Sequence, residues 1–149
     1  MRRYLLLTAI EFALESDRAA IESLLAGSGL PLDGLELALG SAVVARGPGS
    51  LVGCAAIEPY GSVGLLRSVC VAPGLRGTGL GGKLVEAAEK LAATRGIGEL
   101  YLLTETAEGW FPRLGYVRTT RDAVPAALSA SAEFAGACPE SAAVLHKRL

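Results

Sequence analysis

The sequence predicts an α+β fold built on a mixed β-sheet. Residues 41–46, 51–58 and 63–71 are rich in apolar and β-branched side chains, and short glycine-containing turns separate them. Strands joined by such short turns pair antiparallel. Residues 81–95 then show helical periodicity between two strand-like runs, and a crossover helix makes its two flanking strands parallel. This order of elements excludes a regular βαβ alternation.

The remaining elements follow from periodicity and from residues that start or stop helices. Residues 5–14 are expected to supply a first strand, and residues 18–26 a helix that Ser16-Asp17 begin and Gly27 ends. Residues 32–39 are expected to form a short second helix. Residues 100–104 predict a strand, 106–114 a helix capped by Thr106, and 116–121 another strand. A short helix near 125–134 and a strand near 141–147 complete the chain.

Bulk composition narrows the class of protein. With 149 residues, 51% of them hydrophobic and 19% charged, the chain is expected to form one folded domain over residues 1–149. The formal net charge is −1 and no long basic run occurs, which argues against nucleic-acid partners. No apolar run is long enough for a membrane span.

The three cysteines, Cys54, Cys70 and Cys138, lie far apart in the sequence and form no Cys-x-x-Cys pair. This spacing indicates neither a metal site nor a disulfide framework. We therefore expect reduced thiols, no bound metal and a cytoplasmic setting.

A glycine-rich segment, residues 76–83, lies between the strand at 63–71 and the helix at 81–95. Glycines let a backbone approach a ligand closely and adopt positive φ. The free N–H groups and the dipole at a helix N-terminus favour an anion. The segment therefore predicts a binding site for a pyrophosphate.

Three motifs overlap in this segment. Gly77, Gly79 and Gly82 satisfy the dinucleotide pattern G-x-G-x-x-G, with Glu105 available as the acidic partner. The P-loop pattern is nearly met as well, but Leu84 stands where a magnesium-binding Ser or Thr belongs. The third pattern, [Arg/Gln]-x-x-Gly-x-[Gly/Ala], is met by residues 76–81.

With this third pattern, the sequence resembles the Gcn5-related N-acetyltransferase (GNAT) family. Residues 68–73 resemble the family's fourth strand, residues 83–96 its following helix, residues 102–104 its fifth strand, and residues 110–116 the segment that closes the coenzyme A site. The four motifs occur in the family's order over residues 63–116. The resemblance implies a three-layer fold with helices on both faces of the sheet and with strands 4 and 5 splayed apart.

The resemblance also implies where acetyl-CoA binds. The pantetheine arm is expected between the splayed strands, paired with the backbone of Val69 and Val71, and the pyrophosphate on the N–H groups of the glycine-rich segment. The residues that the resemblance assigns to coenzyme A are Val69, Val71, Arg76, Gly77, Thr78, Gly79, Leu80, Gly81, Gly82, Thr104 and Phe111.

A narrower resemblance concerns the acceptor. Residues 64–68, 101–108, 113–116 and 133–142 are similar to the small acetyltransferases associated with arsenic-resistance clusters, a group related to amino-acid acetyltransferases. The resemblance implies acetyl transfer from acetyl-CoA to the primary amine of a small molecule, an amino acid or a similar compound. It also implies a homodimer.

Amide formation from a thioester requires alignment, loss of an amine proton, a polarised carbonyl and a leaving thiolate. We expect direct transfer, in which the backbone N–H of Val69 or Cys70 polarises the carbonyl. Glu58 is the first candidate for the general base, and Glu105 is the second. Phe111 stands where many family members have a proton-donating tyrosine, so water or Tyr60 is left as the acid.

The candidates for acceptor binding are two arginines and a threonine. Arg67 and Arg121 are candidates because a guanidinium can hold a carboxylate bidentately. Thr106 is expected to line the acceptor site. Two other functions stay open: a non-catalytic regulatory domain that binds acetyl-CoA, favoured by Phe111, and a nucleotide-binding enzyme that uses the same glycine-rich segment.

Overall fold

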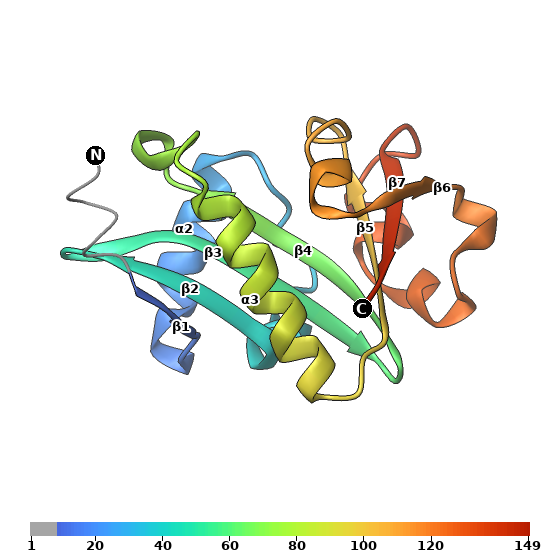
Figure 1. The fold of residues 1–149 in the computed structure, drawn as a ribbon, viewed down its shortest axis with the longest axis horizontal. Coiled ribbons are helices and arrows are strands. Elements are labelled where there is room, and N and C mark those ends of the chain that lie inside the picture. Colours follow the sequence, from blue (N-terminus) through green and yellow to red (C-terminus); the bar gives the residue numbers. More distant parts are fainter. Residues whose placement is uncertain (1–8) are drawn as a thin grey trace.

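The computed structural model describes residues 9–149 and contains one seven-stranded mixed sheet with two α-helices (Figure 1). The strands lie in the order β1-β2-β3-β4-β5-β7-β6. Their bounds are β1 Ala9–Phe12, β2 Ala42–Gly47, β3 Ser50–Tyr60, β4 Val63–Val71, β5 Glu99–Thr104, β6 Val117–Thr119 and β7 Ala143–Arg148. The helices are α2 Arg18–Gly27 and α3 Leu80–Thr94.

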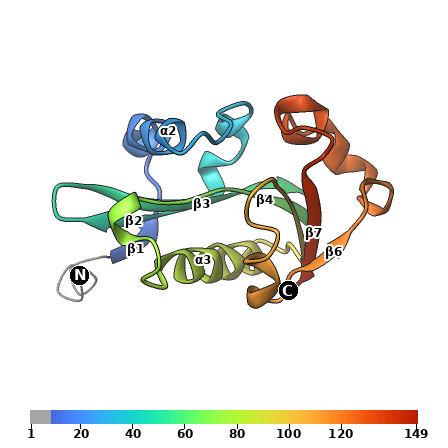
Figure 2. The same ribbon diagram turned by 90° about the horizontal axis from the view of Figure 1, so that it is seen from above.

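The sheet separates two layers of helix. Helix α2 lies on one face and α3 on the other, and the segment between β6 and β7 includes coils on the α2 side (Figure 2). This arrangement confirms the predicted three-layer α+β fold. The predicted strand at 5–14 corresponds to β1, although residues 5–8 lie outside the described residues.

Helix α3 forms because its apolar residues recur on one face. Leu84, Val85, Ala88 and Leu91 are all buried against the inner residues of the sheet, including Ile57 and Leu100. A stripe with this 3.6-residue spacing faces a sheet along the whole helix. Since α3 follows β4 and precedes β5, its packing fixes the position of the glycine-rich segment at the end of β4.

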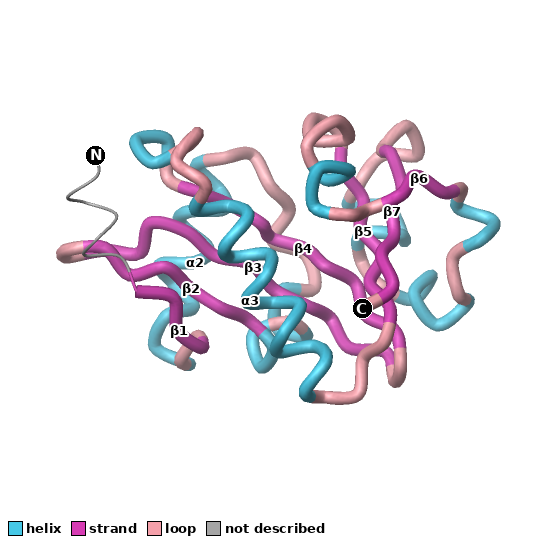
Figure 3. Tube along the Cα trace, in the orientation of Figure 1, coloured by secondary structure: helices cyan, strands magenta, loops and turns pink. Residues whose placement is uncertain are grey.

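Strands β4 and β5 are paired over only a short distance. Their parallel register joins Val63–Leu65 to Glu99–Tyr101, and both strands continue beyond this contact without pairing to each other. They meet at one end of the sheet and diverge toward the other, as a V (Figure 3). The splay implied for strands 4 and 5 is therefore present.

A β-bulge marks the diverging part of β4. Cys54 pairs with Cys70 and Ala56 with Arg67, so that Ala55 alone faces two residues of β4. One of these two residues, Ser68, has φ 59°, and it is the one non-glycine residue with positive φ among residues 9–149. A bulge bends its strand and redirects the backbone groups around it.

Three predicted helices are wrong, and their own glycines, prolines and serines explain why. Residues 32–39 contain only a 3-10 turn at Leu35–Leu37 and the start of another, because Gly34 has φ 75° and breaks the helix. Residues 106–114 contain a single 3-10 turn, Phe111–Leu114, with Pro112 in it. Residues 125–134 form a 3-10 turn that ends at the extended Ser131, and a π turn follows at Glu133–Ala137.

Candidate functional site

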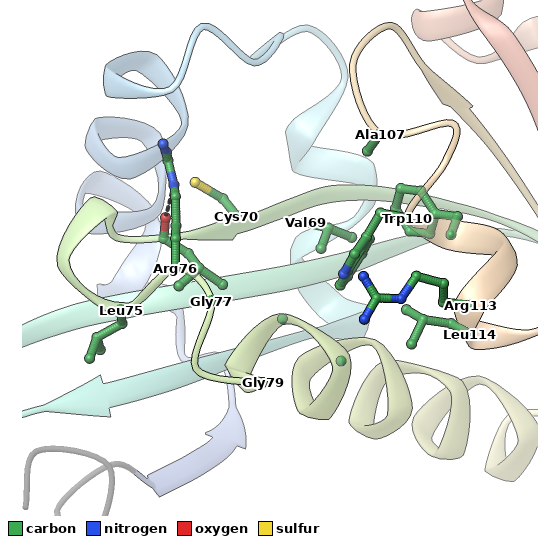
Figure 4. A pocket seen from close by; sticks show the side chains of 14 residues that line it. Val69, Cys70, Leu75, Arg76, Gly77, Gly79, Ala107, Trp110, Arg113 and Leu114 are labelled. Carbon is green, nitrogen blue, oxygen red and sulfur yellow. Dashed lines mark hydrogen bonds between the residues drawn. The ribbon is translucent and has the colours of Figure 1, made fainter. Parts of the chain in front are cut away.

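A cavity of about 670 Å³ opens where β4 and β5 diverge (Figure 4). One wall consists of Val69, Cys70 and Val71 of β4. The glycine-rich segment and the first turn of α3 form the floor, and residues 107–114 form the opposite wall. The cavity therefore lies beside the part of β4 that has no strand partner on the β5 side.

Glycine is required at the floor of this cavity for two reasons. Gly77 and Gly79 have φ 78° and 87°, in the left-handed region that other residues avoid. A Cβ on Gly81 would lie 3.1 Å from Cζ2 of Trp110, so that glycine permits the close contact between α3 and the opposite wall. Because Gly79 is the N-cap of α3, the free N–H groups of the first helical turn would face an anion bound here.

Arg76 connects the floor to the end of β4. Its Nε donates to the carbonyl of Val71 at 3.1 Å, and its Nη2 donates to Oγ of Ser28 at 3.2 Å. The same Ser28 hydroxyl lies 3.1 Å from Sγ of Cys70. These contacts hold a guanidinium at the edge of the cavity, where it would attract a phosphate.

Most residues assigned to coenzyme A line this cavity, but three do not. Thr78 donates its hydroxyl to the carbonyl of Leu75, and Leu80 is buried in the core. Thr104 accepts the N–H of Ala107 at 3.0 Å and thereby shapes the turn after β5. These three residues support the walls of the cavity rather than form its surface.

The wall opposite β4 is aromatic. Phe111 is 6% exposed and packs edge-to-face against Trp110, with ring centroids 4.8 Å apart, and against Tyr116, at 5.6 Å. Sequence motifs assigned Phe111 to the site but missed Arg113, which brings a second guanidinium to the cavity. Arg113 could have been predicted from its position in residues 110–116, the segment that resembles the one closing the coenzyme A site.

A buried ionic cluster lies on the α2 side of the sheet. Nη1 of Arg67 donates to Glu58 at 2.7 Å, and the two side chains are 0% and 1% exposed. Arg67 also donates to the carbonyl oxygens of Asp33 at 2.6 Å and Pro31 at 3.1 Å. Tyr60 donates its hydroxyl to Glu58 at 2.5 Å, and burial, followed by the neighbouring carboxylate, raises the pKa of this tyrosine.

A second carboxyl group completes the cluster. Oε2 of Glu133 lies 3.5 Å from Nε of Arg67, and its side chain is 5% exposed. Burial raises the pKa of Glu133 to about 7, against the opposing effect of Arg67. Burial, with the nearby Glu133 and Glu105, likewise raises the pKa of Cys138 to about 12. Glu133 lies in the segment 133–142 of the narrower resemblance, which assigned it no role.

The structure places the predicted catalytic and acceptor residues in different surroundings. Val69 and Cys70 line the cavity, whereas Glu58 and Arg67 are occupied by each other on the α2 side. Arg121 donates to the carbonyl of Pro139 at 2.8 Å and stacks on Phe134, and Thr106 is exposed after β5. The roles of these residues stay predictions.

The part of the chain that the structure describes contains neither a cluster of metal ligands nor a helix suited to span a membrane. Among residues 9–149, no three His, Cys, Asp or Glu side chains are grouped to hold a metal ion. Over the same residues, no helix has both the length and the apolar character needed to cross a bilayer.

One family of known proteins matches the sequence of this chain. A model described as an acetyltransferase (GNAT) domain matches residues 39–118, just over half of the chain. An amino-acid acetyltransferase of Ralstonia nicotianae is 39% identical over 79 residues, which are 52% of this chain and 18% of that protein. An uncharacterized N-acetyltransferase of Chlorobaculum tepidum is 35% identical over 83 residues, 55% of this chain and 53% of that protein. The matches span less than two thirds of either relative.

Solved structures share the fold. The N-acetylglutamate synthase of Neisseria gonorrhoeae, complexed with coenzyme A and N-acetyl-glutamate, superposes with a TM-score of 0.81 at 24% identity, over 95% of this chain and 35% of that one. Rv2747 of Mycobacterium tuberculosis, in complex with CoA, superposes with a TM-score of 0.77 at 23% identity, over 95% and 99% of the two chains.

Proposed function

This chain belongs to the GNAT acetyltransferase family, and we propose that it transfers an acetyl group from acetyl-CoA directly to the primary amine of a small molecule. The cavity between the diverging β4 and β5 carries the proposal. It joins an unpaired strand edge, which suits an amide-containing arm, to a glycine-lined helix N-terminus, which suits a pyrophosphate. No other described segment combines these two features.

The residues present fit acetyl-CoA. The glycine floor leaves open space above Gly77 and Gly79, where an added Cβ would meet no atom within 4 Å. The pyrophosphate would be held by N–H groups around Gly79 and attracted by the guanidinium groups of Arg76 and Arg113. The backbone of Val69 and Val71 would pair with the pantetheine arm.

The chemistry that these residues supply is mainly alignment and polarisation. The backbone N–H of Val69 or Cys70, redirected by the bulge at Ser68, is the proposed donor to the thioester carbonyl. Holding the amine against the thioester can lower the barrier by about 7–11 kcal/mol in favourable cases. Phe111 cannot donate a proton, so we propose that water protonates the leaving thiolate.

The proposed acceptor is an amino acid or an amino-acid-like compound, including the arsenic-containing analogues that the narrower resemblance implies. Sequence relatives named amino-acid acetyltransferase support the amino-acid part of this proposal. Arg67, Arg121 and Thr106 remain the proposed acceptor-binding residues. A homodimer belongs to the same proposal, and light scattering of the free protein tests it.

Coenzyme A release from acetyl-CoA, measured against a panel of amino acids, phosphinothricin-like amines and arsenical analogues, tests this function. Turnover with one class of amine, and none without amine, is the expected result. Binding of acetyl-CoA without turnover of any amine would instead support a non-catalytic acetyl-CoA-binding domain, the function that Phe111 favours. Absence of acetyl-CoA binding would contradict both.

A further inference from the structure

We infer that Glu133, on the segment between β6 and β7, receives the acceptor as an ammonium ion and takes the proton that makes it nucleophilic. The inference rests on the proposed acetyl transfer and names the acceptor form and the group that activates it. The sequence analysis named Glu58 as the first candidate for the general base, so Glu58 and Glu133 are alternative candidates for the same role.

Charge balance within the buried cluster is the first argument. One guanidinium, Arg67, lies between two carboxyl groups, with 2.7 Å to Glu58 and 3.5 Å to Glu133. All three side chains are at most 5% exposed. If both carboxyl groups are ionised, the cluster has one uncompensated negative charge, which is costly away from water. A bound ammonium group would supply the missing positive charge.

Hydrogen bonding distinguishes the two carboxyl groups. Glu58 accepts a short hydrogen bond from Arg67 on one carboxylate oxygen and another from Tyr60 on the other, so both of its oxygens already have donors. Glu133 has only the longer contact with Arg67 and a weak thiol partner in Cys138. Glu133 is therefore the carboxyl group of the cluster that still has room for a further hydrogen-bond partner such as an ammonium group.

The position of the ionic cluster next to Val69 also supports Glu133 as the group that takes the proton. Arg67 and Ser68 directly precede Val69, the residue whose backbone faces the proposed thioester. Besides burial, the carboxyl groups of Glu133 and of Glu105, just beyond the end of β5, both raise the pKa of Cys138. The cluster thus joins Glu58 of β3 and Arg67 of β4 to Glu133 of the segment between β6 and β7, on the α2 side of the sheet. The glycine floor and α3 lie on the opposite side (Figure 2).

The proton and electron changes balance. The carboxylate of Glu133 takes one proton from the ammonium group, directly or through one water molecule. The freed lone pair forms the C–N bond, the C–S bond breaks, and water passes the second amine proton to the leaving thiolate, which becomes the thiol. Glu133 then releases its proton to solvent, so each turnover yields one amide, one thiol and one free proton.

The experiment measures kcat/KM for the best acceptor from pH 5 to 9 at saturating acetyl-CoA. Because the carboxyl of Glu133 has a pKa of about 7, we expect wild-type activity to rise with pH and to level off above about 7. Glu133→Gln should remove this inflection and lower kcat by about 10²–10⁴-fold, leaving acetyl-CoA binding unchanged. Glu133→Asp should keep the inflection at reduced kcat.

Control variants separate this role from a structural one. Glu140→Gln removes an exposed carboxylate from the same segment and should leave both profile and rate unchanged. If Glu133→Gln keeps the inflection with kcat within threefold of wild type, or if Glu58→Gln or Glu105→Gln abolishes it instead, the inference is overturned. A wild type that turns over no amine would reject the proposed function itself, and with it this inference.

Discussion

The left-handed glycine at the start of α3 allows a matched test of the proposed cofactor site. Gly79 and Gly49 both have φ 87°, and an added Cβ would meet no atom within 4 Å at either position. Alanine at either position therefore introduces backbone strain without a clash, at a cost of about 1–2 kcal/mol. For a chain of this length, each kcal/mol lowers Tm by about 2–4 °C.

The two variants should differ only in ligand binding. Gly79 is the N-cap of α3 on the cavity floor, whereas Gly49 lies in the turn between β2 and β3. Relief of strain at Gly79 rotates N–H groups away from the pyrophosphate, and each lost charge-assisted hydrogen bond costs about 1.5–3 kcal/mol. We therefore expect Gly79→Ala to raise the Kd of acetyl-CoA at least tenfold and Gly49→Ala to leave it unchanged.

Isothermal titration with acetyl-CoA, combined with thermal unfolding of the free proteins, measures both effects. Similar losses of Tm with a Kd increase only in Gly79→Ala would support the assignment. If Gly79→Ala binds acetyl-CoA within twofold of wild type, the glycine floor does not hold the pyrophosphate. If Gly49→Ala weakens binding equally, the effect arises from general destabilisation.

Three further predictions concern the aromatic wall, the core and an ion pair. Phe111→Tyr should leave acetyl-CoA affinity within twofold and raise kcat in steady-state assays, because it adds a proton donor beside the cavity. Gly53→Ala should lower the free energy of unfolding by about 1–3 kcal/mol in urea titrations, because its Cβ would lie 2.7 Å from Leu84. Hydrogen bonds from Arg46 lower the pKa of Asp17 from 3.8, so this pair stabilises the protein above pH 3.8 and is lost below it. Asp17→Asn should therefore be less stable at pH 7 and lose less stability on acidification, as monitored by circular dichroism.

Periodicity and turn residues were sufficient to predict most of the fold. The antiparallel strands, the crossover helix and the parallel β4–β5 pair all appear where local sequence patterns placed them. The wrong predictions are helices, and they occur where a single glycine, proline or serine interrupts a run that otherwise has helical periodicity. The helix expected at 106–114 is limited to one turn because Pro112 lacks an N–H and the Ala107 carbonyl accepts from both Trp110 and Phe111.

The candidate site was predictable where a motif encodes backbone conformation. Gly77, Gly79 and Gly81 are recognisable because glycine itself makes the loop geometry possible. The ionic cluster was not predictable, because Arg67 and Glu133 are 66 positions apart and meet only through tertiary folding. Nothing in a single sequence indicates which arginine will be enclosed by which carboxylates.

The narrow junction between β4 and β5 has a consequence for how the chain resists unfolding. Among residues 9–149, three register pairs join the block β1–β4 to the block β5–β7–β6 within the sheet. A molecule that lies in the opening and bonds to both sides adds its binding free energy to the cohesion of the two blocks, as RT ln(1 + [L]/Kd). A higher concentration of free ligand should therefore raise Tm and lower both amide exchange and cleavage by proteases. When ligand is scarce, the two blocks of the same chain would be held together only loosely.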